Sequence, residues 1–334
     1  MKWKIFLTVG LLMLTSGLSA IDECRIIFWN LENLFLPGND SLTEDDEFTP
    51  LGERHWTWER YRKKINLVWK TLYSATPGGP PEIIALGEVE NRKVIEDIFK
   101  RSPLNQFSYR ILHQDSPDPR GIDLAIAYRA DRVRLIDSSF IEIDFPELSG
   151  RQTRDIVYAR FCIGTDSLDL FVNHWPSKYG GSGYTDILRV RCAGILLEKI
   201  FRLSGRVGEK ALVCCGDFND TRESRALNHL LEMSGNGPGG LRLVETRSDR
   251  VRGTLKYQGK WEQIDHFFIN NKLAENAGSG LKFESALILE YEWLLTGDEV
   301  YGGFKPFRTY NGFSYAGGIS DHLPVMLVIS FDRR

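Results

Sequence analysis

The sequence predicts a single domain of the α/β class, in which layers of strands and helices form a sandwich. Short apolar runs of strand length recur along the 334 residues, and several are too continuously apolar to leave one face in water. Longer segments with the 3.6-residue apolar spacing of helices stand between these runs. Strands packed face to face with helices outside would bury both kinds of segment, so we expect a layered α/β sandwich.

Eight runs are expected to form strands, because each is apolar, of strand length and followed by polar residues. They span residues 25–29, 82–86, 122–128, 156–163, 168–172, 211–215, 264–269 and 324–329. The expected helices span residues 58–73, 94–101, 186–203 and 223–233. Two further stretches, the acidic residues 37–56 and the glycine- and aromatic-rich residues 297–319, are predicted to be long loops, which are often functional.

The N-terminus has the pattern of a secretory signal peptide. Two lysines precede an apolar run over residues 5–14, and a serine and an alanine at the end of the segment supply a cleavage site. The run is shorter than the about 20 residues of a membrane span, which favours a cleaved signal over a retained anchor. We therefore expect a signal peptide over residues 1–20, a domain over residues 21–334, and export to the periplasm or the medium.

Charge and cysteine content limit the kinds of site to expect. The net charge is −3, and removal of residues 1–20 takes away two lysines and no acid, which leaves −5. Tight nonspecific binding to nucleic acid is therefore not implied, although an enzyme that turns its substrate over does not need it. No C-x-x-C pair occurs, so a zinc site is not expected, whereas one or two disulfides stay open. The five cysteines are Cys24, Cys162, Cys192, Cys214 and Cys215.

Polar residues with metal-binding or catalytic chemistry stand where the predicted strands begin or end. Carboxylate and amide oxygens, with no thiolate among them, suit a hard cation such as Mg²⁺ or Mn²⁺. Histidines beside them add proton transfer or phosphate contacts. If the strands share a sheet edge, these groups converge on one rim. The residues are Asn30, Glu88, His174, Asp217, Asn219, Asp265, Asp321 and His322.

In chain order these residues lie in the segments WNLEN, LGEVEN, NHWPS, GDFND, QIDH and SDHLPV. This order resembles the endonuclease/exonuclease/phosphatase superfamily, the deoxyribonuclease I-like proteins, over roughly residues 25–330. GDFN and SDH are the most diagnostic pieces, and the NHWPS form is similar to secreted bacterial members. The resemblance implies a four-layer αββα sandwich and a metal-dependent hydrolase of phosphate esters.

The resemblance also implies roles for individual residues. Glu88 would be the principal metal ligand and Asp321 a second one, while Asn30 would help to hold the metal or the phosphate. Asp217 would orient or deprotonate the attacking water, and Asn219 would contact the scissile phosphate.

Two histidines and an arginine complete the site that the resemblance implies. His322, oriented by Asp265, would bond the phosphate or take a proton. His174 would stabilise or protonate the leaving group, with Asp123 as its carboxylate partner. Arg154 resembles the phosphate-binding arginine of the deoxyribonuclease branch. A general acid or base contributes typically about 10²–10⁴-fold, so loss of either histidine should cripple turnover without unfolding the chain.

Two positions depart from the family pattern. Gly87 replaces the glutamine that commonly precedes the metal-binding glutamate. Glu90 stands where deoxyribonuclease-like members often carry a basic residue, which weakens the case for that branch's grip on the minor groove.

The leading functional prediction is an exported nuclease that hydrolyses DNA or RNA by metal-assisted, in-line attack of water. The paired His174 and His322 and the expected export favour it. The alternatives are a sphingomyelinase-like phosphodiesterase acting on a phospholipid, a phosphatase acting on inositol or sugar phosphates, and an inactive binding module. We expect a monomer with no obligate protein partner.

Three other groups of residues have two or more interpretations. The acidic run 43–47 is either a structural Ca²⁺ loop or, by default, a solvated face. The basic residues among positions 60–64 would form a phosphate clamp or, by default, a solvated helix face. The aromatic residues of positions 293–315, with Lys305 and Arg308 among them, would stack bases, enter a membrane interface or, by default, pack the loop down.

Overall fold

The computed structural model describes residues 21–41, 43–145, 153–178, 182–203, 210–276 and 280–332. Two six-stranded mixed sheets form its centre. The first contains, in spatial order, β13 (Leu281–Ile288), β18 (Val325–Asp332), β1 (Ile21–Leu34), β2 (Ile83–Val89), β4 (Asp123–Arg129) and β3 (Tyr109–His113). The second contains β5 (Arg134–Ile141), β6 (Ile156–Ile163), β7 (Asp166–His174), β8 (Ala211–Asp217), β12 (Asp265–Asn270) and β9 (Leu241–Leu243).

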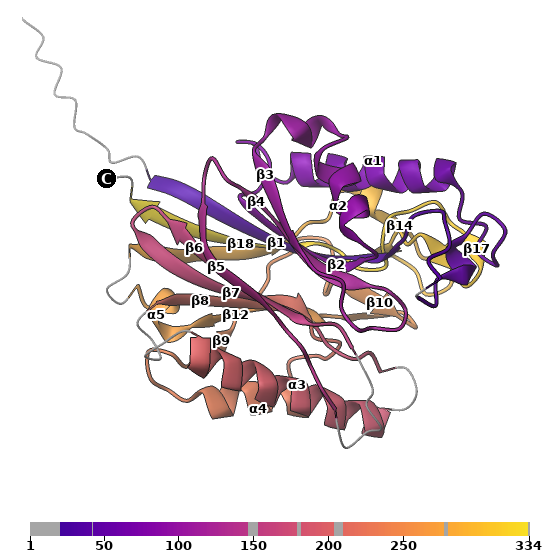
Figure 1. The fold of residues 1–334 in the computed structure, drawn as a ribbon. Helices are drawn as coiled ribbons and strands as arrows, with labels where there is room; N and C mark the ends of the chain where they lie inside the picture. Colours follow the sequence, from indigo (N-terminus) through magenta and orange to yellow (C-terminus); the bar gives the residue numbers. More distant parts are fainter. Residues whose placement is uncertain are drawn as a thin grey trace, which may run out of the picture.

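Helices cover the outer face of each sheet, so that the molecule has four layers (Figure 1). The helices α1 (Trp58–Ser74) and α2 (Arg92–Phe99) lie on the first sheet, and α3 (Ser182–Leu203) and α4 (Arg225–Ser234) lie on the second. The predicted four-layer αββα sandwich is therefore confirmed. The shorter helices are α5 (Asn271–Ala274), η1 (Asp46–Phe48), η2 (Pro103–Gln106) and η4 (Glu292–Leu294).

The local sequence explains where the helices begin. Thr57, Asn91 and Ser224 precede α1, α2 and α4, and each side chain accepts a hydrogen bond from a backbone N–H of the first turn. These caps satisfy donors that have no partner within the helix.

The core lies mainly between the two sheets, where the apolar runs of the central strands face each other. In β2, residues 83–86 are fully buried, as expected for a strand covered on both faces. A second apolar cluster lies between the second sheet and α3 and α4. All five cysteines have free thiols, so neither of the disulfides left open by the sequence is formed.

All eight predicted strands and four predicted helices are present. The edge strands β3, β5, β9 and β13 were not predicted, and the segment 297–319 is not a plain loop. Three small hairpins lie around that segment, formed by β10 (Leu255–Tyr257) with β11 (Lys260–Glu262), β14 (Leu295–Gly297) with β15 (Phe304–Pro306), and β16 (Tyr310–Asn311) with β17 (Ser314–Tyr315). The predicted signal peptide, residues 1–20, lies outside the described residues. None of the described helices has the length and hydropathy of a membrane span.

Strand direction brings the predicted site residues to one rim. β1 runs parallel to β2, and β7 runs parallel to β8, so the carboxyl ends of the strands in each pair lie together. β12 and β18 run antiparallel to β8 and β1, which places the start of each at the same rim. Side chains that are far apart in sequence therefore meet there.

Candidate active site

Six of the predicted residues form a continuous string of side chains at this rim. His174 Nε2 lies 3.8 Å from Glu88 Oε1 and 3.6 Å from Asp217 Oδ2. His322 Nε2 lies 3.8 Å from the same Asp217 oxygen and 4.0 Å from Asp321 Oδ1. On its other side, His322 Nδ1 bonds Asp265 Oδ2 at 2.8 Å. Asp217 therefore lies between two imidazoles.

Asn30 joins the two halves of this string. Its side-chain nitrogen donates to Glu88 Oε1 at 3.2 Å and to Asp217 Oδ2 at 3.0 Å. Its oxygen, the atom that would bind a metal, accepts from the backbone N–H of Glu32 at 2.9 Å. These bonds place Asn30 between Glu88 and Asp217. Its oxygen has a second lone pair, so the predicted contact with metal or phosphate stays a prediction.

Several residues at the rim adopt the left-handed backbone conformation, which residues other than glycine rarely take. Glu32, Asn33, Glu88 and Asn219 have φ values of 47°, 54°, 58° and 52°. The irregularity near the end of β1, between Asn30 and Leu34, aims the Asn33 N–H at Glu88 Oε2, 2.8 Å away. Such positions commonly occur at functional sites, where the surrounding structure offsets the strain.

Gly216 fits the backbone at the end of β8. A Cβ there would lie 2.0 Å from the carbonyl oxygen of Asn173 on the neighbouring strand, and the residue has a φ of 151°. Only glycine permits this close approach, which aligns Asp217 with His174 in the strand register. The glycine of the GDFN segment is therefore explained by packing of β8 against β7.

Burial and charge set the protonation of Asp217 and His322. Burial raises the pKa of Asp217 to about 7, although the positive charge of His322 opposes the rise. Burial by itself would lower the pKa of His322, but the carboxylates of Asp265 and Asp217 more than offset this and hold its pKa well above the ordinary value. Near neutral pH, Asp217 is therefore able to take a proton while His322 is an imidazolium.

His174 differs from His322 in its electrostatics, and the predicted pairing of His174 with Asp123 is wrong. Burial lowers the pKa of His174 well below its ordinary value, and the charge of Arg154 adds to this. Its Nδ1 is buried without a hydrogen-bond partner. The Asp123 carboxylate instead accepts from Ser116 and lies 3.3 Å from His113 Nε2. His174 is therefore neutral, and Asp123 orders the start of β4.

Arg154 and Asn219 lie behind the rim and fix the loop after β7. The Arg154 guanidinium donates to Asp118 at 3.0 Å and to the Trp175 carbonyl at 2.9 Å, and only 4% of the residue is exposed. The Asn219 side chain donates to the same carbonyl at 2.9 Å. The Arg154 side chain is buried and each terminal nitrogen makes one bond within the protein, so its predicted phosphate contact stays a prediction.

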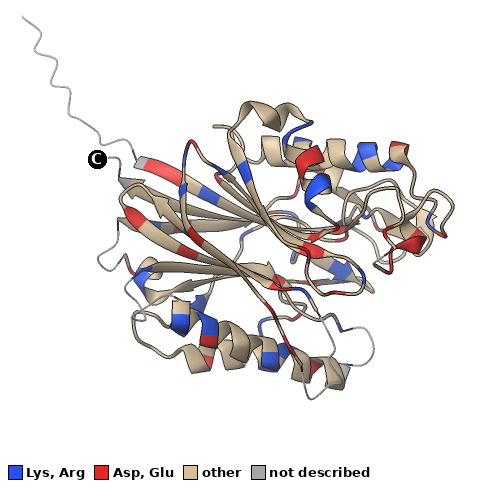
Figure 2. Ribbon diagram, in the orientation of Figure 1, with Lys and Arg blue, Asp and Glu red and all other residues tan. Residues whose placement is uncertain are grey.

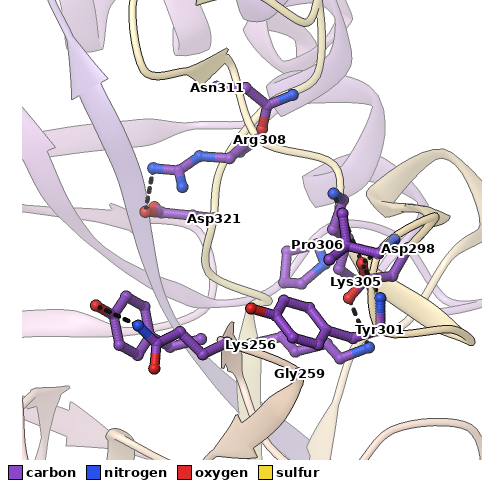
Figure 3. A pocket seen from close by; sticks show the side chains of 12 residues that line it. Lys256, Gly259, Asp298, Tyr301, Lys305, Pro306, Arg308, Asn311 and Asp321 are labelled. Atoms are coloured by element: carbon purple, nitrogen blue, oxygen red, sulfur yellow. Dashed lines mark hydrogen bonds and ion pairs between the residues drawn. The ribbon is translucent and has the colours of Figure 1, made fainter.

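Sequence reasoning missed a second network that holds the Asp321 side of the site. The buried Lys64 ammonium, assigned by the sequence to a solvated face, donates to Glu32 O at 2.7 Å and to Thr309 Oγ1 at 2.8 Å. Glu32 in turn accepts from the Thr309 N–H at 2.7 Å. Arg308 lies 3.1 Å from Asp321 Oδ2 (Figure 3). Helical spacing contained a signal for Lys64, which falls in the stripe of buried residues on α1.

The donor set fits a divalent cation. Five carboxylates line the rim against the cations Lys64, Arg308 and His322, so negative charge is in excess. Among these acids, Glu88 and Asp321 are the most solvent-accessible, at 15% and 27% of the side chain, and are the candidate ligands. Asp217, Asp265 and His322 also lie within 4.8 Å of one another. This cluster is a second group that could hold a metal ion, although the 2.8 Å bond to Asp265 already occupies His322 Nδ1.

The acidic run 43–47 shows no such convergence. The buried Asp45 accepts hydrogen bonds from the Asp40 backbone N–H, so its oxygens close the turn. The Ca²⁺ loop stays a prediction.

Two facing mixed sheets, with acids, an amide and imidazoles gathered at their strand ends, define a phosphoesterase with the deoxyribonuclease I-like fold. A sequence model of the Endonuclease/Exonuclease/phosphatase family matches residues 25–331, and the chain belongs to that family. A comparison with curated protein sequences gave no significant match.

Solved structures share the fold at low sequence identity. An endonuclease/exonuclease/phosphatase family protein from Bacteroides thetaiotaomicron is 15% identical, with a TM-score of 0.59 over 93% of this chain and 96% of that one. TDP2 from D. rerio, complexed with a single-strand DNA product, is 18% identical, with a TM-score of 0.54 over 92% and 98%. A mannosyl-6-phosphatase from Bacteroides thetaiotaomicron VPI-5482 is 16% identical, with a TM-score of 0.56 over 92% and 100%.

Proposed function

We propose that this protein is an exported, Mg²⁺- or Mn²⁺-dependent nuclease that hydrolyses a phosphodiester of DNA or RNA. The observation that carries the proposal is the placement of Asp217 between a neutral His174 and a charged His322. Hydrolysis of a phosphodiester needs a base for the attacking water, a cation near the equatorial oxygens and a hydrogen-bond donor for the leaving oxygen. Asp217, His322 and His174 supply these in that order.

Each side chain has one task in the proposed reaction. Asp217 takes a proton from the attacking water, which its pKa of about 7 suits. The imidazolium of His322, held by Asp265, donates hydrogen bonds to the phosphate oxygens. His174 donates a hydrogen bond to the leaving oxygen. A cation bound by Glu88 and Asp321 would neutralise charge on the phosphate.

Location and assembly are part of the proposal. Residues 1–20 are proposed to direct export and to be removed, with the mature protein acting as a monomer in the periplasm or the medium. Recovery of protein that begins at Ile21 from either compartment would support export. Lysines and arginines are interspersed with acids on the helices of both outer layers (Figure 2), which favours binding of substrate by the site itself.

The test is hydrolysis by purified protein with Mg²⁺, Mn²⁺ or a chelator. Plasmid DNA, RNA and a chromogenic phosphodiester are compared for the wild type, Asp217→Asn and His174→Ala. We expect metal-dependent cleavage of nucleic acid, reduced about 10²–10⁴-fold in either variant. Arg62→Gln, an exposed change on α1, is the matched control and should retain full activity. If DNA and RNA both stay intact after incubation with folded protein and either metal, the nuclease proposal is ruled out.

A phosphatase or lipid phosphodiesterase is the second candidate. A cavity of about 190 Å³ beside Asp321 favours it, because charged side chains that include Lys256 and Arg308 line the cavity. The mannosyl-6-phosphatase with the same fold shows that a monoesterase is compatible with this architecture. Release of inorganic phosphate from sugar or inositol phosphates, or of phosphocholine from sphingomyelin, with no cleavage of nucleic acid, would select this candidate.

A further inference from the structure

Arg308 is the counter-ion of Asp321, one of the two candidate metal ligands. Its Nη2 lies 3.1 Å from Asp321 Oδ2, and its Nε lies 3.3 Å from Glu32 Oε1. Glu88 also attracts it electrostatically, together with these two acids. Arg308 and Lys64 thus face the same three carboxylates, in the region where a divalent cation would add positive charge.

Arg308 and Asp321 also line the cavity of about 190 Å³. The opposite wall is Tyr301, whose ring lies against Gly259, where a Cβ would approach the ring to 2.8 Å. In Figure 3 the Tyr301 hydroxyl points into the open space between this wall and the Asp321–Arg308 pair. The cavity therefore adjoins the candidate active site at Asp321, and its volume is large enough for part of a substrate.

The charges of the cavity lining would change when Asp321 binds a cation. Lys256 is neutralised by Asp298, 2.8 Å away, in an ion pair with both side chains at most 5% exposed. Lys305 is 31% exposed and 4.0 Å from Asp298, so it is less tightly held. With Asp321 engaged elsewhere, Arg308 and Lys305 would leave the cavity with a net positive charge. Such a lining suits an anionic group.

The fold permits Arg308 to move while its backbone stays in place. The Thr309 N–H is bonded to Glu32, and Gly318 packs against residue 307, where a Cβ would lie 2.0 Å from the Phe307 carbonyl oxygen. The Arg308 side chain itself is 42% exposed, which allows a change of rotamer at modest cost. Only the guanidinium needs to change partners.

We propose that Arg308 exchanges partners: a divalent cation at Asp321 releases the guanidinium, which then binds a phosphate group of the substrate in the cavity. The planar guanidinium matches two phosphate oxygens, which makes it suited to this second partner. The inference rests on the proposed phosphoester hydrolase function and its metal site. Arg308 is then a substrate-binding residue that competes with the metal in the free protein.

The test compares Arg308→Gln with Arg54→Gln. Arg54 is the matched control, because it holds the same loop through the Gly312 carbonyl and the rings of Phe48 and Tyr310 without contacting Asp321. Binding of Mn²⁺ alone is measured by calorimetry, and binding of inorganic phosphate is then measured in saturating Mn²⁺. We expect Arg308→Gln to bind Mn²⁺ about 2- to 5-fold more tightly, the scale of a half-exposed ion pair. Its phosphate affinity should fall about 10-fold, the scale of a charge-assisted hydrogen bond.

The two opposite shifts separate exchange from a structural role. A structural role would weaken the affinities for Mn²⁺ and for phosphate in both Arg308→Gln and Arg54→Gln, and that result would overturn the proposal. Unchanged Mn²⁺ affinity in Arg308→Gln would overturn it as well. If Arg308→Gln does not fold, Arg308→Lys is used instead, because it keeps the charge and loses the two-pronged geometry of the guanidinium. Phosphate affinity equal to wild type in Arg308→Lys would also overturn the proposal. Neither measurement requires turnover, so failure of the nuclease proposal would be seen separately in the cleavage assay.

Discussion

Two histidines at the rim show how surroundings give one residue type two roles. His322 is within reach of Asp217, Asp265 and Asp321, so its charged form is favoured despite burial. His174 is equally buried but feels the positive charges of Arg154 and Arg120, so its neutral form is favoured. Because one is an imidazolium and the other a neutral imidazole, they are not interchangeable in the proposed reaction.

Asp265→Asn tests this assignment. Removal of the carboxylate should lower the pKa of His322 toward or below the ordinary 6.5, so that the imidazolium present in the wild type is lost as pH rises above that value. We expect kcat to fall about 10-fold near pH 6 and about 10²-fold or more near pH 8, since the charged form is lost only at the higher pH. The measurement is a pH–rate profile on a chromogenic phosphodiester. An equal loss across that range would mean that Asp265 acts by packing alone.

At the scale of the element, α1 buries a charge that ties three segments together. Lys64 lies in the apolar stripe of the helix with Tyr61, Ile65 and Val68. Its ammonium binds the last part of β1, at Glu32, and the segment that leads to Asp321, at Thr309. Burial lowers the pKa of Lys64 to about 8, although the charge of Glu32 opposes the fall. The helix therefore positions the site as well as covering the sheet.

Lys64→Met should destabilise the protein more than an ordinary lysine substitution. It leaves the Glu32 carbonyl and the acids nearby without their buried cation, and loss of one partner of a buried charged group costs about 3–5 kcal/mol. The free energy of unfolding, from urea titration, is the measurement. Arg62→Met, an exposed position on the same helix, is expected to change it by less than about 0.5 kcal/mol. Similar values for the two variants would contradict a structural role for the Lys64 charge.

At the scale of the whole molecule, the two sheets enclose the core while an excess of carboxylates collects at one rim. Like charges held together in the folded state repel one another, so an ion that binds only the folded protein should stabilise it. The rim is assembled from both sheets, with Glu88 on the first and Asp217 on the second. Ion binding is therefore expected to raise the free energy of unfolding of the whole domain.

Mg²⁺ or Mn²⁺ should raise the melting temperature, and a chelator should reverse the rise. At about 100 times the dissociation constant the gain is about 2.7 kcal/mol. Glu88→Gln should abolish most of the metal-dependent rise, whereas Glu96→Gln, which changes an acid paired with Lys100 on α2, should preserve it. The measurement is thermal unfolding at several metal concentrations. A full metal-dependent rise in Glu88→Gln would place the ion elsewhere.

The sequence by itself determined the central strands, the covering helices and the string from Glu88 to His322. Continuous apolar runs mark strands buried on both faces, and the polar motifs stand at the ends of those strands. The edge strands escaped prediction because their burial is mixed; β5, for example, has only one buried position. Edge strands carry no continuous apolar run, so their pairing depends on the rest of the sheet.

Only the tertiary structure decided which groups are partners. The pairing of Asp123 with His113, the burial of Arg154 against Asp118, and the position of Arg308 on Asp321 all join segments distant in sequence. The protonation states of His174 and His322 follow from the same arrangement. A motif specifies the type of side chain at a strand end, but hydrogen bonds and pKa values depend on distances and burial, which exist only when the two sheets are packed together.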